Sequence, residues 1–262
     1  MSSAAMQIAR TGIDAQDMRM RVISNNLANV NTTGFKSDRA AFETLAYQTV
    51  TVPGTPSTAE SNYATGLSLG TGVRIAGTAK IDTQGSMQTT GNSLDLALDG
   101  DGYFQVQLPA GQLGYTRAGN FSRSAEGQLV TSEGYQVMPG VTIPQGSTSI
   151  TIGTDGTVSA TVPPATTATQ VGQLQVASFP NSAGLQSIGD NYLTETAASG
   201  AVNLGIAGQD GRGNIRQGML ESSNVNVVQE LVDMIECQRA YEVNSKMITA
   251  TDDMLKYVNQ NI

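Results

Sequence analysis

Several short strings in the chain match, in part, the spacing of motifs that carry chemistry. Residues 66–70 (GLSLG) have the G-x-S-x-G spacing of a nucleophilic serine on a sharp turn. That chemistry needs a histidine to accept the serine proton, and the 262-residue chain contains no histidine. The lack of histidine also removes the commonest ligand for zinc and haem iron. We interpret residues 66–70 as a chance match.

The other candidate ligand sites also fail on spacing. Residues 99–102 (DGDG) begin like an EF-hand calcium loop, but Tyr103 and Phe104 stand where the loop needs an oxygen ligand and a glycine. Residues 208–213 (GQDGRG) fit neither the dinucleotide fingerprint nor the phosphate loop. Cys237 is the only cysteine and lies in an apolar-periodic stretch, which favours a packing role. The sequence predicts no catalytic residue, no metal site, no cofactor and no enzymatic activity.

Composition narrows the class of protein further. Charged residues make up 14% of the chain, whereas an average soluble domain carries about 25%. Glycine is frequent, with 29 residues, which is typical of a chain rich in turns and β-structure. The net charge of −8 argues against nucleic acid as a partner. Neither a run of about 18 apolar residues nor a basic leader followed by an apolar region is present, so we expect no membrane insertion and no cleaved signal peptide.

The N-terminal segment carries apolar side chains at alternating steps of three and four residues, as a coiled-coil helix does. The pattern predicts a helix over residues 4–31, followed by Gly34 in the left-handed position just after the helix end. A second apolar stripe runs along another face of the same helix. The main stripe, which we predict to be a self-assembly seam, consists of Met6, Ala9, Ile13, Met20, Ile23, Leu27 and Val30.

The C-terminal segment repeats this pattern and predicts a helix over residues 227–262, with Asn226 as its N-cap. It also carries a second apolar stripe. One antiparallel partner covers a single stripe on each helix, so the surplus predicts association with further copies of the chain. A membrane-surface helix is the competing use, but the chain contains no tryptophan and its N-terminal part has only a small positive excess. The C-terminal seam consists of Val227, Leu231, Met234, Tyr241, Ile248 and Leu255.

The middle of the chain alternates apolar and polar residues over 103–108, 149–152 and 173–177, with glycine-containing turns between such runs. This pattern predicts short antiparallel strands and hairpins. Residues 46–66 have no helical period, and we predict that they form an extended arm or linker. The arm is marked by Tyr47, Pro53, Pro56 and Gly66.

Together these patterns predict an α+β fold in which the two chain ends pair as a helical coiled-coil inner domain and the middle forms a β-rich outer domain of antiparallel hairpins. The predicted divisions are a helical assembly domain, an arm and a β-rich domain, at residues 1–45 with 220–262, 46–66, and 67–219 respectively.

Four strings in this order resemble the bacterial flagellar rod and hook axial proteins. They are residues 23–36 (ISNNLANVNTTGFK), 99–106 (DGDGYFQV), 115–121 (YTRAGNF) and 222–255. The length of the chain and the segment at residues 47–66 are most similar to distal rod subunits. The first string contains the family motif residues Asn25, Asn26, Leu27, Ala28, Asn29, Gly34 and Phe35.

The resemblance implies a structural subunit of the flagellar basal body, in the part of the rod that spans the periplasm. It implies a helical homopolymer that forms a straight, rigid, hollow shaft, transmits torque to the hook and carries the export channel. The implied partners are further copies of the chain, the proximal rod, hook and ring-bushing proteins, and the flagellar type III export apparatus. A proximal rod or hook subunit is an alternative within the family, and a β-rich surface adhesin with helical anchors is an alternative from another class.

Overall fold

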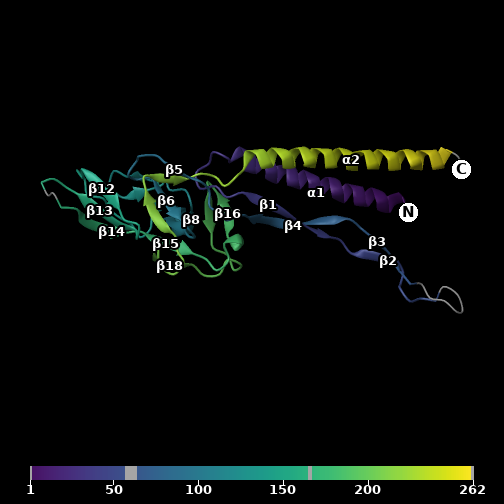
Figure 1. Ribbon diagram of the computed structural model, residues 1–262, viewed down its shortest axis with the longest axis horizontal. Coiled ribbons are helices and arrows are strands. Elements are labelled where there is room, and N and C mark those ends of the chain that lie inside the picture. Colours follow the sequence, from purple (N-terminus) through teal and green to yellow (C-terminus); the bar gives the residue numbers. More distant parts are fainter. Residues whose placement is uncertain (1, 57–63, 165–166, 261–262) are drawn as a thin grey trace. The chain divides into compact units, whose positions relative to one another are not determined.

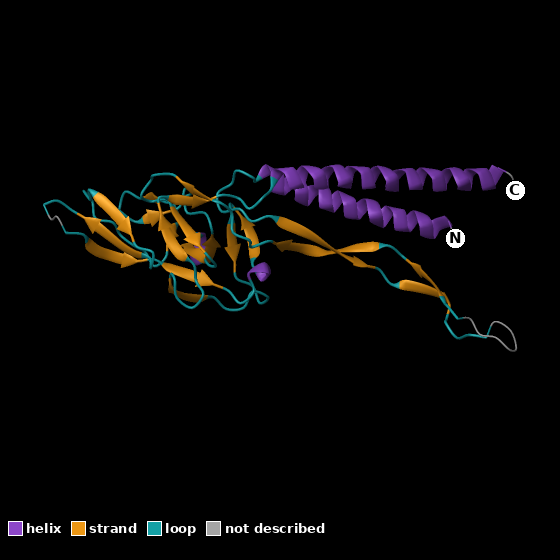
Figure 2. Ribbon diagram, in the orientation of Figure 1, coloured by secondary structure: helices purple, strands orange, loops and turns teal. Residues whose placement is uncertain are grey.

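The computed structural model describes residues 2–56, 64–164 and 167–260. Two long helices lie at the two ends of the chain, and the residues between them form short strands that pair antiparallel (Figure 2). The α+β class predicted from the sequence is confirmed. No helix in the described part of the chain combines the length and apolarity needed to cross a membrane.

The chain divides into two compact units. The helical unit contains residues 1–27, 38–79 and 226–262, and the β unit contains residues 28–37 and 80–225. The sequence instead placed its divisions at residues 45 and 66. The structure differs because the strand that begins at Asp38 pairs with the strand that ends at Lys80, so residues on both sides of the predicted arm belong to one hairpin.

The helical unit is built on α1 (Ser2–Ala28) and α2 (Val227–Gln260), which run antiparallel so that both chain ends lie at the same end of the pair (Figure 1). The predicted N-cap of α2 is present: the side-chain oxygen of Asn226 accepts the backbone N–H of Val228 at 3.1 Å. The last two residues of the predicted C-terminal helix, 261–262, lie outside the described residues.

The prediction that Gly34 follows the end of the first helix is wrong. Helix α1 ends at Ala28, and a turn in which Asn29 accepts the N–H of Thr32 comes next. Gly34 does adopt a positive φ of 67°, but the reason is a close backbone approach in the β unit. A Cβ on Gly34 would lie 2.5 Å from the carbonyl carbon of Arg117, so no larger residue fits there.

The rest of the helical unit is a long two-stranded hairpin. Its inner part pairs β1 (Asp38–Thr44) with β4 (Val73–Lys80), and its outer part pairs β2 (Tyr47–Thr51) with β3 (Leu67–Gly70). The two parts meet where the N–H of Leu45 donates to the oxygen of Gly72 at 2.9 Å. We call β2, β3 and the residues between them the distal arm.

The centre of the β unit is β7 (Tyr103–Gln107). It pairs antiparallel with β8 (Leu113–Thr116), β11 (Gln136–Val137) and β15 (Gln175–Ser178). The same sheet contains β9 (Ser122–Arg123), β10 (Leu129–Val130), β16 (Gln186–Gly189), β17 (Tyr192–Thr194) and β18 (Asn203–Ile206).

Smaller sheets complete the β unit. They pair β5 (Met87–Thr89) with β20 (Met219–Glu221) and β6 (Leu96–Asp99) with β19 (Asn214–Gln217). In a three-stranded sheet, β13 (Thr157–Thr161) lies between β12 (Ser149–Ile152) and β14 (Thr169–Gln173). Two short 3₁₀ helices, η1 (Pro109–Gly111) and η2 (Ser182–Gly184), lie in connections.

The alternation of residues 103–108 has the predicted consequence for packing. Phe104 and Val106 lie in one buried cluster, whereas Tyr103 packs in a second cluster with Tyr115 and Ala177. The single strand predicted over residues 173–177 is wrong, because the chain leaves one sheet at the end of β14 and enters another at β15. Between them the fully buried Leu174 donates its N–H to the oxygen of Gly156 at 2.8 Å.

Candidate assembly interface

The contact between α1 and α2 combines polar and apolar groups. The buried thiol of Cys237 donates to the carbonyl oxygen of Gln16 at 3.0 Å, and burial raises the pKa of this thiol. Arg19 and Asp233 form an ion pair at 3.1 Å. Cys237 therefore packs as a small side chain between two helices, which agrees with the role predicted for it.

The predicted seam residues divide into three groups. Ala9 and Ile23 are buried, and Val227, Leu231 and Tyr241 are exposed. Val30 lies beyond the end of α1, in the turn that follows it. The half-buried group consists of Met6, Ile13, Met20, Leu27, Met234, Ile248 and Leu255.

Helix α2 exposes more apolar surface than α1 covers. Val228 is 71% exposed and Met254 is 63% exposed, although both are large apolar side chains. Surfaces of this kind mark interaction sites in soluble proteins. We call this set the α2 surface, and it consists of Val227, Val228, Leu231, Val232, Ile235, Tyr241, Val243, Met247 and Met254.

The lengths of the helices explain part of this exposure. Helix α2 has 34 residues and α1 has 27, which correspond to about 51 Å and about 40 Å. Gly12 lies against the side chain of Asn244, so the first residues of α1 reach α2 near Met254. The residues of α2 after Met254 therefore lie beyond the start of α1.

Asn26, a residue of the family motif, joins three elements of the helical unit. Its side-chain amide donates to the backbone oxygen of Asp38 at 2.9 Å and to Glu230 at 3.0 Å, and its oxygen accepts the N–H of Asp38 at 2.9 Å. Asn26 is only 2% exposed. It therefore fixes the start of β1 and the first turn of α2 onto α1. The resemblance of residues 23–36 to the axial proteins did not specify this role.

The other motif residues lie on α1 and in the segment that follows it. Asn25 is exposed on α1, Leu27 is half-buried, and Ala28 is the last residue of α1. The side chain of Asn29 accepts a hydrogen bond from the Thr32 hydroxyl at 3.1 Å. Within the β unit, the Lys80 ammonium nitrogen lies 5.7 Å from the centre of the Phe35 ring.

Glu230 provides a pH-dependent test of this packing. Burial raises the pKa of its carboxyl, the hydrogen bond from Asn26 opposes that rise, and the nearby Asp233 adds to it. An acid with a raised pKa in the folded state opposes folding when it is ionised, and the penalty disappears as pH falls towards the ordinary glutamate pKa of about 4.3.

We expect Glu230→Gln to raise the melting temperature of the helices at neutral pH, because glutamine keeps an acceptor for Asn26 without a buried charge. The advantage should shrink as the pH is lowered. Thermal unfolding followed by circular dichroism at several pH values measures it, with the exposed Glu242→Gln as the control. A stabilisation that does not change with pH would contradict the stated cause.

A second attachment holds the hairpin to α1. The hydroxyl of Thr11 accepts the N–H of Val73 at 3.3 Å, and it lies so close to Gly72 that a Cβ there would overlap it. Sequence reasoning missed Thr11 and Gly72, since neither belongs to an apolar period. Beyond this point, the described residues of the distal arm make no hydrogen bond or ion pair with α1.

The distal arm is apolar and exposed on both strands. Tyr47 is 63% exposed, and Val50, Val52, Leu67 and Leu69 are each about half exposed. Near the tip, a Cβ on Gly66 would lie 2.6 Å from Pro53, so glycine lets the two strands approach each other there. Pro56 is exposed, and residues 57–63 of the predicted arm lie outside the described residues.

Two of the strings that resembled catalytic or ligand sites, residues 66–70 and 99–102, take part in strand pairing. Asp99 forms an ion pair with Arg216 across β6 and β19 at 2.9 Å, and the backbones of Asp101 and Arg212 form an isolated β-bridge. Residues 66–70 lie at the start of the distal arm's second strand, where Ser68 pairs with Thr49. Within the described ranges, no group of three or more acidic or cysteine side chains is placed to hold a metal ion.

These features define an α+β protein whose two chain ends pair as helices and leave an apolar surface uncovered. Three family models match the chain: "Flagella basal body rod protein" at residues 6–36, "Flagellar hook protein FlgE/F/G D1 domain" at residues 97–160, and "Flagellar basal body rod FlgEFG protein C-terminal" at residues 216–261.

Full-length relatives agree with these matches. The chain is 48% identical to the flagellar basal-body rod protein FlgG of Buchnera aphidicola subsp. Acyrthosiphon pisum and 46% identical to FlgG of Caulobacter vibrioides, with 98% of each chain covered in both cases. It is 35% identical to FlgF of Caulobacter vibrioides over 89% of this chain and 87% of that one. The chain belongs to the flagellar basal-body rod protein family.

Proposed function

We propose that this protein is a subunit of the distal flagellar rod, where copies of it assemble into a straight, rigid, hollow shaft. The shaft transmits torque to the hook and encloses the export channel. The resemblance of residues 47–66 to the corresponding segment of distal rod subunits supports the distal position. Greater identity to FlgG than to FlgF supports membership of the FlgG branch of the family. The role is structural and involves no catalysis. The neighbours are the proximal rod, the hook and the ring bushing, and the subunit reaches its place through the flagellar export apparatus.

The observation that carries this proposal is the α2 surface. Burial of apolar surface contributes about 25 cal/mol per Å², and full burial of one Val, Leu, Ile or Met side chain contributes about 1.5–3 kcal/mol. The α2 surface offers nine such side chains on one helix, counting Tyr241 with the aliphatic residues. Contact with a second copy buries them, and repetition of that contact along an axis produces a polymer with the helices packed together.

Location along the flagellar axis separates this proposal from its alternatives. Antibodies raised against the β unit, coupled to gold, can be applied to isolated basal bodies and viewed by electron microscopy. We expect label on the rod just below the hook. Label at the base of the rod or on the hook would favour the other subunits of the family, and label across the cell surface would favour an adhesin.

We further propose that the distal arm contacts a neighbouring subunit and prevents axial sliding. Its exposed apolar side chains support this role, and so does its attachment to α1 at Thr11 and Gly72, since a fixed base gives the arm a defined direction. Pro53 and Pro56 restrict the backbone near the tip and favour extended chain.

Deletion of residues 47–70 should convert straight polymers into curved or flexible ones. Ala46 and Thr71 can be joined directly because the Thr71 hydroxyl already donates to the Ala46 oxygen at 2.6 Å. Electron microscopy of the polymers measures their curvature. A control that keeps the arm and replaces the exposed Gln48 of β2 with alanine should remain straight. Straight, stiff polymers from the deletion variant would refute the proposed role of the arm.

A further inference from the structure

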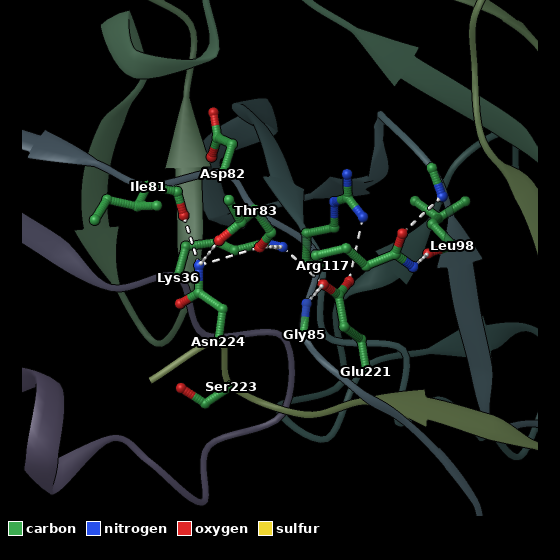
Figure 3. A network of polar contacts seen from close by, with 12 residues as sticks. Lys36, Ile81, Asp82, Thr83, Gly85, Leu98, Arg117, Glu221, Ser223 and Asn224 are labelled. Carbon is green, nitrogen blue, oxygen red and sulfur yellow. Dashed lines mark hydrogen bonds and ion pairs between the residues drawn. The ribbon is translucent and has the colours of Figure 1, made fainter. Parts of the chain in front are cut away.

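A buried ionic cluster within the β unit joins segments from both ends of the chain (Figure 3). The side chain of Glu221 is fully buried, and its carboxylate accepts hydrogen bonds from three groups. These are the Lys36 ammonium at 2.7 Å, the Arg117 guanidinium at 3.2 Å and the backbone N–H of Gly85 at 2.9 Å. Each of the two cations is only 5% exposed at its side chain.

The cations have further partners that fix their positions. The Lys36 ammonium also donates to the backbone oxygen of Thr83 at 2.9 Å. Burial lowers the pKa of Lys36, and the bond to Glu221 opposes that change. The guanidinium of Arg117 lies 5.3 Å from the ring centre of Tyr103, whose hydroxyl donates to Asp82 at 3.2 Å.

Backbone bonds connect the same segments. The N–H of Gly34 donates to the backbone oxygen of Glu221 at 2.8 Å, and the N–H of Ser37 donates to the side-chain oxygen of Asn224 at 2.7 Å. The Asn224 amide donates in turn to the oxygens of Ile81 at 2.7 Å and Thr83 at 3.1 Å (Figure 3). Residues 34–37, 81–85 and 221–224 therefore form one hydrogen-bonded set.

Because of its charges, the stability of this hydrogen-bonded set depends on segments from both ends of the chain. Lys36 comes from the N-terminal side and Glu221 from the C-terminal side, 185 positions apart in the sequence. A buried charge that loses its partner costs much more than a broken surface pair, because water cannot replace the lost partner. If residues 221–224 leave, Lys36 and Arg117 remain as two buried cations next to each other, with no carboxylate between them.

We propose that Lys36, Arg117 and Glu221 act as a clasp that makes residues 34–37 and 221–224 become ordered in a single step. Neither chain end docks onto the β unit without the other. The clasp thus marks a boundary in the chain. Residues before 34 and after 224 can become ordered or disordered without exposing the ionic cluster. This proposal does not rest on the function of the protein in the rod, because it concerns one copy of the chain.

Hydrogen exchange of the full-length chain, below the concentration at which it polymerises, tests the clasp. The amide of Ile81 is held by the oxygen of Ser37 and reports docking of the N-terminal segment. The amide of Ser222 is held by the oxygen of Ser86 and reports docking of the C-terminal segment. We expect both amides to open with the same free energy and the same denaturant dependence. Distinct openings for the two amides would overturn the proposal.

Substitutions then test whether the charges provide the coupling. Lys36→Met should speed exchange at Ser222 by about a hundredfold, because it leaves the buried Glu221 carboxylate with Arg117 but without Lys36. Glu221→Gln should do the same at Ile81, because it leaves both buried cations without a carboxylate. Amides of β7 should change much less. Arg216→Met is the matched control, since it breaks the exposed ion pair with Asp99 in the same unit and should change neither amide.

The pattern of the effects decides the outcome. Faster exchange confined to the substituted segment would refute the clasp, because the other end would then dock independently. Should either variant fail to fold, the exchange measurement on the unaltered chain still gives the answer.

Discussion

Leu231→Asp should abolish polymer formation and leave both units folded. Leu231 is 44% exposed on α2, so a charge there meets water in a single copy of the chain. In the proposed polymer the same position would face a neighbour, and a buried, unpaired carboxylate is strongly unfavourable. The penalty recurs at every copy, so we expect no sedimenting polymer at concentrations where the unaltered chain assembles fully.

The position of the substitution matters for this test. Ile23→Asp is also expected to stop assembly, but Ile23 is only 4% exposed and its replacement disrupts the helical unit itself. Gln229→Asp provides the matched control, since it adds the same charge to an exposed polar position in the first turn of α2, where a negative charge is favourable. Normal polymers from Leu231→Asp would show that the α2 surface is not the seam.

Gly119→Ala should strongly destabilise the β unit. The backbone of Gly119 lies so close to Leu96 that a Cβ would overlap the Leu96 carbonyl oxygen. The clash is with backbone, and the N–H of Leu96 is bonded to the oxygen of Gly119 at 3.0 Å, so neither segment can move without breaking this contact. We expect a loss of about 3 kcal/mol or more in the free energy of unfolding, at or beyond the upper end for overpacked sites.

Chemical denaturation of the full-length chain measures this loss. Gly77→Ala is the control, because no atom lies within 4 Å of a Cβ at Gly77 and its φ is in the ordinary range. The control should change stability by no more than about 0.5 kcal/mol. A Gly119→Ala variant as stable as the control would mean that the segment around Gly119 can move away from β6 at little cost.

The helices could be predicted from sequence because their apolar period is long and their N-cap signal at Asn226 is local. The end of α1 was harder to place. Gly34 has the conformation expected of a helix-ending glycine, yet its positive φ serves the approach to Arg117, far away in the sequence. A local pattern cannot distinguish these two reasons for a glycine.

The inner part of the long hairpin, β1 and β4, was not predicted, and the reason is different. Most residues of β1 and β4 are exposed on both faces, so no apolar alternation marks them as strands. Their pairing is fixed by contacts to α1 through Asn26 and Thr11, which lie in another part of the chain. The predicted arm therefore covered only the outer part of the hairpin.

The ionic cluster was missed altogether. Arg117 and Glu221 stand alone among uncharged neighbours in the sequence, and Lys36 is followed closely by Asp38 and Arg39. Charged residues are mostly on the surface, so none of the three is marked as buried. Two of them do lie within strings shared with the axial proteins, at the end of residues 23–36 and in the middle of residues 115–121. A lone charge inside such a string is the one available signal, and only the fold shows which partner neutralises it.

The measurement that tests the central claim most directly is sedimentation of the purified full-length chain over a series of concentrations, with electron microscopy of any pellet. We predict that straight tubes form above a threshold concentration, because the α2 surface becomes covered only when copies meet. A chain that stays monomeric at every concentration, with both helices fully formed, would contradict the account and reopen the alternative of an adhesin-like protein.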